Sequence, residues 1–128
     1  MKEQPVPFPA LRTSGLMLRE IEPSDAERLH AVWTDPLVAE HLVLDPFTEI
    51  RETEAMISLL RKLHASGEGI RWAITLLCDG TPVGTCGFHN WKKEHGRAEL
   101  GYELDSRMWR QGYMREAVSA ALEYAFDT

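Results

Sequence analysis

The residues with the clearest capacity for chemistry lie near the end of the sequence, in the run Trp109-Arg110-Gln111-Gly112-Tyr113-Met114. A strand-like segment precedes this run and an apolar helical pattern follows it, so the run predicts a turn that opens a helix. The first N–H groups of a helix have no partner within it, and the helix dipole is positive there. A pyrophosphate satisfies both, Gly112 lets it approach the backbone, and Arg110 and Arg115 add positive charge. The alternative is a plain strand–helix loop with solvated arginines.

Two carboxylates lie on the predicted strand before this turn. Glu99 and Glu103 are four residues apart, so both face the same side of a regular strand. A carboxylate can take the proton of an ammonium, directly or through water, which makes either one a candidate general base. His89 and Asn90, at the end of the neighbouring predicted strand, are candidates for lining the same cleft. A solvated strand face for the glutamates and a structural role for the histidine are the alternatives.

A framework of strands and helices must position these residues. The apolar patterns predict strands over residues 16–21, 71–78, 82–91 and 97–104, with a hairpin turn at residues 79–80. A first helix is predicted after Ser24, which together with Glu27 has the spacing of a capping box. Further helices are predicted over residues 37–42, 49–65 and 112–126.

The bulk properties narrow the class of protein. The 128 residues suffice for one domain, and the net charge of −6 argues against a nucleic-acid binder while mildly favouring cationic substrates. No apolar run approaches the roughly 20 residues that span a bilayer. The N-terminus lacks the apolar stretch of a signal peptide, which predicts a cytoplasmic protein without a membrane partner. Cys78 and Cys86 form no metal or redox motif, and both are expected to be reduced, buried thiols.

The run Ala98-Glu99-Leu100-Gly101-Tyr102-Glu103-Leu104, read together with residues 109–117, resembles the acyl-CoA motif of the GNAT superfamily. The resemblance is greatest to the RimJ/RimL-type branch of ribosomal-protein N-acetyltransferases. Gly84-Thr85-Cys86-Gly87-Phe88 and the opening at residues 11–19 support it, so it covers nearly the whole chain from Leu11 onward. The family's phosphate turn is usually written Q/R-x-x-G-x-G/A. Trp109 and Met114 depart from its first and last positions in the manner of this branch.

The resemblance implies an α/β (α+β) fold, with a mixed, mostly antiparallel sheet and flanking helices. The domain is expected over residues 11–128, after an extended lead-in at residues 1–10. Acetyl-CoA is the implied co-substrate, with no metal. Its pantetheine is expected to lie as an added strand against the backbone of Tyr102 to Leu104, and its pyrophosphate is expected to bind the turn before the last predicted helix. The implied donor-binding residues are Tyr102, Glu103, Leu104, Arg110, Gln111, Gly112, Tyr113, Met114 and Arg115.

The implied reaction moves an acetyl group to a primary amine, either a protein N-terminal amine of the ribosomal-protein type or a small amine. Glu99 and Glu103 are the catalytic candidates. Trp33, His89 and Asn90 are the candidates for substrate contact, with a core position as the alternative for Trp33.

Family domains continue beyond the last predicted helix and carry there the group that protonates the CoA thiolate. We therefore expect the 128-residue chain to be weakly active or inactive. The open explanations are a shortened chain, a homo-oligomer whose subunits cover each other, and a non-catalytic acyl-CoA-binding remnant or interaction module.

Overall fold

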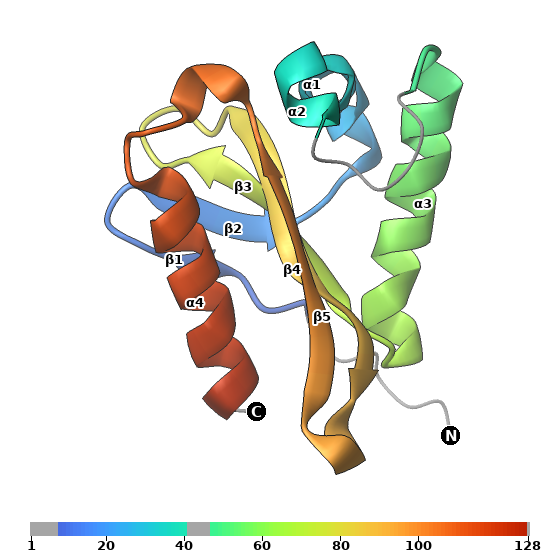
Figure 1. Ribbon diagram of the computed structural model, residues 1–128, viewed down its shortest axis with the longest axis vertical. Helices are drawn as coiled ribbons and strands as arrows, with labels where there is room; N and C mark the ends of the chain where they lie inside the picture. The colour runs from blue at the N-terminus through green and yellow to red at the C-terminus, as the bar shows by residue number, and fades with distance from the viewer. Residues whose placement is uncertain (1–7, 41–46, 128) are drawn as a thin grey trace.

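The structure is a computed structural model that describes residues 8–40 and 47–127. Its centre is an antiparallel sheet of five strands in the order β1-β2-β3-β4-β5 (Figure 1). The strands are β1 (Leu11–Arg12), β2 (Leu16–Glu20), β3 (Ile70–Leu76), β4 (Pro82–Lys92) and β5 (Arg97–Leu104). The α+β fold with flanking helices is as predicted, and only the two-residue strand β1 was not expected.

The helices lie on both faces of the sheet. They are α1 (Ala26–Thr34), α2 (Pro36–Ala39), α3 (Ile50–Ser66) and α4 (Tyr113–Asp127), with short 3-10 turns η1 (Pro23–Asp25), η2 (Lys93–His95) and η3 (Ser106–Met108). Figure 1 shows α4 on one side of the sheet and α3 on the other, with α1 and α2 at the top of the view, where β5 ends and β4 begins. None of the helices in the described part of the chain is long and apolar enough to cross a bilayer.

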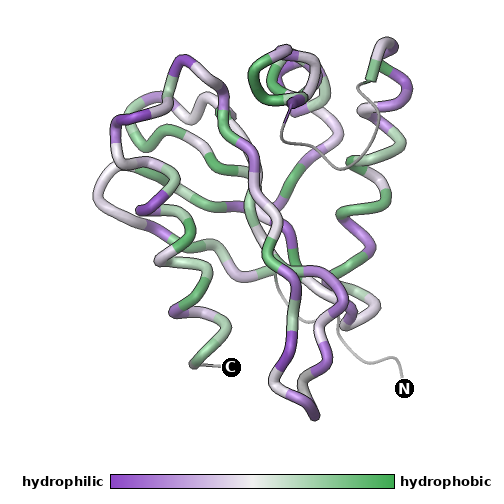
Figure 2. The backbone as a smooth tube through the Cα atoms, viewed as in Figure 1, coloured by the Kyte–Doolittle hydropathy of each residue, from purple (hydrophilic) through white to green (hydrophobic). Residues whose placement is uncertain are grey.

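Each face of the sheet has its own core. On the α4 face, Trp72 is fully buried, and the small side chains of Ala117 and Ala121 allow the helix to lie close to the strands. On the opposite face, α1 and α3 pack Trp33 and Ile57 against the sheet. Polar residues gather instead at the tip of the β4–β5 hairpin, which is mainly hydrophilic in Figure 2.

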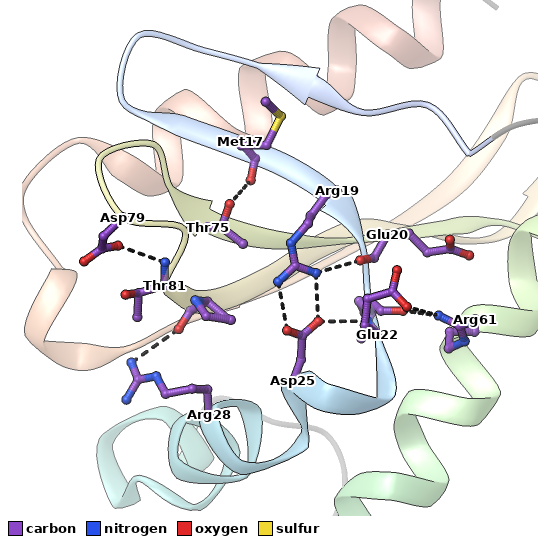
Figure 3. Close-up of polar contacts among 12 residues, drawn as sticks. Met17, Arg19, Glu20, Glu22, Asp25, Arg28, Arg61, Thr75, Asp79 and Thr81 are labelled. Atoms are coloured by element: carbon purple, nitrogen blue, oxygen red, sulfur yellow. Dashed lines mark hydrogen bonds and ion pairs between the residues drawn. The ribbon is translucent and has the colours of Figure 1, made fainter.

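The start of the first helix differs from the prediction. Ser24 is exposed and caps nothing. Instead Glu22 and Asp25 form the capping box around η1, with the Glu22 N–H donating to Asp25 Oδ2 at 2.8 Å. Pro23 fixes the first position of this turn, so the cap falls two residues earlier than Ser24. The same Asp25 carboxylate accepts two hydrogen bonds from the Arg19 guanidinium on β2 (Figure 3), which ties the helix start to the sheet.

Two further predictions need correction or restriction. Cys78 is exposed, because β3 ends at Leu76 and the chain has already entered the hairpin turn. Cys86 is buried as expected, and that burial raises the pKa of its thiol to about 12. The short helix predicted over residues 37–42 is α2 and ends at Ala39; residues 41–42 lie outside the described part of the chain.

Strand β5 is the last strand of the sheet, and Gly84 of β4 allows the two strands to pack closely. A Cβ at Gly84 would lie 2.1 Å from the backbone oxygen of Glu103, so no larger residue fits without moving the two strands apart. Among the described residues, no strand pairs with the outer edge of β5. After β5 the chain continues directly into η3 and the turn before α4. The end of β5 therefore forms one wall of the site described next.

Candidate functional site

A pocket of about 360 Å³ lies where the end of β5, the loop around η3 and the start of α4 meet. Val38 of α2 closes another side of it. All of the predicted donor-binding residues except Gln111 line this pocket. The remaining lining residues are Met108 and Trp109, so the walls are mainly apolar and the charge is supplied by a few side chains at the rim.

The turn at the start of α4 presents unpaired backbone donors to this pocket. Arg110 and Gly112 have φ values of +66° and +81°, in the left-handed region on either side of Gln111. Backbone that alternates in this way directs successive N–H groups toward one point, the geometry of an anion-binding nest. Among the described residues, none of the N–H groups of residues 111–115 has a hydrogen-bond partner, and the first helical bond runs from Glu116 N to Gly112 O at 3.0 Å.

The charge around the turn is positive. Arg110 and Arg115 are exposed, and neither forms an ion pair with any described residue. The one acidic residue in the first turn of α4, Glu116, is directed elsewhere: its Oε1 accepts hydrogen bonds from the Thr13 hydroxyl and, at 2.6 Å, from Gly15 N–H. The Thr13 hydroxyl, the Gly15 N–H and the Ser14 hydroxyl together lower the pKa of Glu116. The carboxylate thus anchors the β1–β2 loop and leaves the turn free for an anion.

The hydrogen-bond register of β5 defines which of its backbone groups face outward. The N–H of Asp105 donates to Val83 O at 2.7 Å, so residue 105 points toward β4. The backbone groups of successive residues alternate along an antiparallel ladder, which is regular here. The N–H and C=O of Glu103 therefore also point toward β4, while those of Tyr102 and Leu104 point toward the free edge. The Leu104 carbonyl already accepts the indole N–H of Trp109 at 2.9 Å. Between Tyr102 and Leu104 the edge groups that remain are the N–H and C=O of Tyr102 and the N–H of Leu104, and by the same alternation the N–H and C=O of Leu100 also face outward.

The side chain of Glu103 lies beneath the pocket and is almost fully buried. Its Oε1 accepts hydrogen bonds from Trp33 Nε1, at 2.7 Å, and from the Thr85 hydroxyl. Its Oε2 accepts from Arg71 Nη2 at 2.5 Å, in an ion pair whose side chains are 9% and 8% exposed. Donors from the strands β3 and β4 and from helix α1 therefore converge on one carboxylate of β5, and Trp33 contacts it from the core.

The other predicted residues gather elsewhere. His89 Nε2 lies 2.9 Å from Glu99 Oε2, and Asn90 Nδ2 donates to the same oxygen at 2.8 Å. None of these three residues lines the pocket, and they form an exposed cluster nearer the hairpin tip. Glu99 and Glu103 lie on the same face of β5, as predicted. They are four residues apart on the strand, however, so Glu99 is exposed and Glu103 is buried, and they have no hydrogen-bond partner in common.

Sequence reasoning missed several residues that build the site, including Arg71, Thr85, Asp105 and Ser106. One signal was available: an arginine within an otherwise apolar strand needs a buried partner. In the structure Gly101, two strands away on β5, makes room for this arginine, since a Cβ there would lie 2.3 Å from Arg71 Nη1. The loop contacts made by Asp105 and Ser106 have no comparable signature in the sequence.

Comparison with known proteins gives consistent matches. Residues 15–128 match the family described as acetyltransferase (GNAT) domain. The chain is 36% identical over 118 residues to the uncharacterized N-acetyltransferase p20 of Bacillus licheniformis, covering 92% of this chain and 66% of that protein. It is 35% identical over 120 residues to the uncharacterized N-acetyltransferase YoaA of Bacillus subtilis, covering 94% and 68%. The chain thus spans about two thirds of the length of these relatives.

The fold is shared with solved structures as well. A structure of RimL, a ribosomal L7/L12 alpha-N-protein acetyltransferase, in complex with coenzyme A superposes with a TM-score of 0.80 at 22% identity. The match covers 91% of this chain and 67% of that one.

The buried position of Glu103 predicts a large difference between the two glutamates of β5. Glu103→Ala leaves Arg71 buried without its partner and should lower the free energy of unfolding by about 3 kcal/mol. Glu99→Ala, on the same face of the same strand but exposed, should lower it by less than about 1 kcal/mol. Urea denaturation followed by circular dichroism measures both. Equal losses for the two variants would contradict the buried network.

Proposed function

The chain belongs to the GNAT acetyltransferase family, and we propose that it transfers an acetyl group from acetyl-CoA to a primary amine. In this reaction the amine nitrogen attacks the thioester carbon, the C–N bond forms, the C–S bond breaks, and CoA leaves as a thiolate that takes up a proton. The observation that carries the proposal is the turn at the start of α4. Within the described part of the chain, its N–H groups have no hydrogen-bond partner, its two arginines form no ion pair, and the sheet edge beside it is unpaired.

The pyrophosphate of the donor is assigned to this turn. Hydrogen bonds from the N–H groups of residues 111–115 replace water around the phosphates, and Arg110 and Arg115 neutralise charge from the rim. The RimL protein that shares this fold was solved in complex with coenzyme A. This likeness supports the choice of CoA as the ligand.

The pantetheine arm is assigned to the outer edge of β5. Its amide groups can pair with the N–H and C=O of Tyr102 and the N–H of Leu104, the groups that the register leaves free. Glu103 has no part in this pairing, because its backbone faces β4. The apolar lining of the pocket, including Val38 and Met108, suits the alkyl part of the arm.

The acceptor is assigned only as a primary amine, which must be neutral to attack. Glu103 is the carboxylate at the pocket and remains the candidate base there, although three donors already occupy it. Glu99, with His89 and Asn90, lies outside the pocket toward the hairpin tip, so this cluster is assigned to contact with a part of the acceptor away from the reacting amine. The likeness to RimL favours a peptide N-terminus as the acceptor. The negative net charge favours a basic acceptor, whether a peptide or a small amine.

A second function is acyl-CoA binding without turnover. The hydrogen bonds of Glu103 favour this function, because Trp33, Thr85 and Arg71 already occupy most of the positions at which its carboxylate could accept a proton or a hydrogen bond. No other carboxylate of the described residues lines the pocket.

Thiol release distinguishes the two functions. With acetyl-CoA, DTNB and a panel of short peptides with free N-termini and small amines, the transferase predicts amine-dependent release of CoA thiol. The same peptides with acetylated N-termini serve as the matched control and should release none. CoA binding without release for any acceptor would favour the binding function instead. Absence of both binding and release would contradict both.

Substitution of Gly112 tests the phosphate turn. Gly112→Asp puts a carboxylate beside the pyrophosphate, and a Cβ there meets no atom within 4 Å, so the side chain has room. CoA binding should weaken by about 2 kcal/mol, or roughly 30-fold, relative to Gly112→Asn, which adopts the left-handed conformation without the charge. Isothermal titration calorimetry measures both Kd values. Equal affinity in the two variants would show that the phosphates bind elsewhere.

A further inference from the structure

The loop that carries the phosphate turn is held in place by contacts from outside the pocket. Asp105, at its start, is buried, and its backbone is bonded to β4. Its carboxylate accepts hydrogen bonds from Arg107 N at 3.0 Å and from Arg107 Nη2 at 2.7 Å. These bonds lower the pKa of Asp105, with the Arg107 side chain as the largest cause. Arg28 of α1 adds a second cation 3.5 Å from the same carboxylate.

A second contact joins this loop to the corner between α1 and α2. The Ser106 hydroxyl, on η3, donates a hydrogen bond to Asp35 Oδ2. The other oxygen of Asp35 accepts from Leu37 N at 2.9 Å and caps α2. One carboxylate therefore fixes both the start of α2 and the position of η3.

Both of the joined elements supply walls of the pocket. Val38, the third residue of α2, is buried and lines the pocket. On the other side, η3 continues through Met108 and Trp109 into the phosphate turn. The Asp35–Ser106 bond thus spans the two halves of the pocket although neither residue lines it.

We propose that Asp35 and Ser106 are positioning residues of the donor site, which hold the α2 wall and the phosphate turn at the separation that acyl-CoA requires. The proposal rests on the function proposed above. It makes donor affinity depend on the corner between α1 and α2, although of these two helices only α2 lines the pocket, through Val38. Loss of the bond lets η3 move relative to α2 and misplaces the N–H groups of the turn.

Calorimetric titration of CoA into matched variants tests this proposal. Ser106→Ala removes the hydroxyl while leaving the Asp35 cap of α2 intact, and it should raise the Kd for CoA about tenfold. Ser106→Thr retains the hydroxyl and should bind within about twofold of the unsubstituted chain. Thr34→Val is the control: among the described residues, the Thr34 hydroxyl next to Asp35 donates to His30 O within α1 and to no group of the pocket or of η3, so CoA affinity should not change.

Each outcome bears on the proposal. A Kd unchanged by Ser106→Ala would overturn it while leaving the proposed function in place. Equal weakening by Thr34→Val would overturn it as well, because a general loosening of the corner would then explain the effect. Failure of the unsubstituted chain to bind CoA would overturn the proposed function and this inference together. Circular dichroism of each variant establishes that a change in Kd is not a loss of fold.

Discussion

A carboxylate that loses nearly all of its water must find donors within the protein, and Glu103 finds them on three different elements. Arg71 of β3, Thr85 of β4 and Trp33 of α1 all bind it. Removing one partner of a buried ion pair is far more costly than removing an exposed pair, so this network resists rearrangement. It ties the last strand of the sheet to β4, to β3 beyond it and to helix α1, and the geometry of the pocket follows from the position of that strand.

Two consequences for the site follow from the fixed position of β5. Its outward-facing backbone groups lie at the same pocket as the turn at the start of α4, whose N–H groups have no partner among the described residues. The turn itself is anchored from three directions: by Glu116 to the β1–β2 loop, by Asp105 to β4, and by Ser106 to Asp35. A binding site for an extended, negatively charged ligand needs such rigidity at both ends, because an ordered site loses less entropy on binding.

Local patterns in the sequence were enough to predict most of the elements and the position of the turn. Alternating and helical apolar spacing depends on neighbours in sequence, and Gly112 before a helix is a local signal as well. The errors arose where two local signals compete or where partners are distant. Pro23 shifted the cap from Ser24 to Glu22, and β3 ended before Cys78. The separation of Glu99 from Glu103 depends on Arg71, 32 residues from Glu103, and no periodicity encodes that contact.

The central claim is that the turn opening α4 binds the phosphates of acyl-CoA, and amide chemical shifts test it most directly. In ¹H–¹⁵N correlation spectra of the chain titrated with CoA, the amides of residues 111–115 should shift markedly, because each gains a charged acceptor. The amides of His89 and Asn90, in the exposed cluster near the hairpin tip, should stay close to their starting positions. Shifts concentrated at the hairpin, or none at the start of α4, would contradict the account.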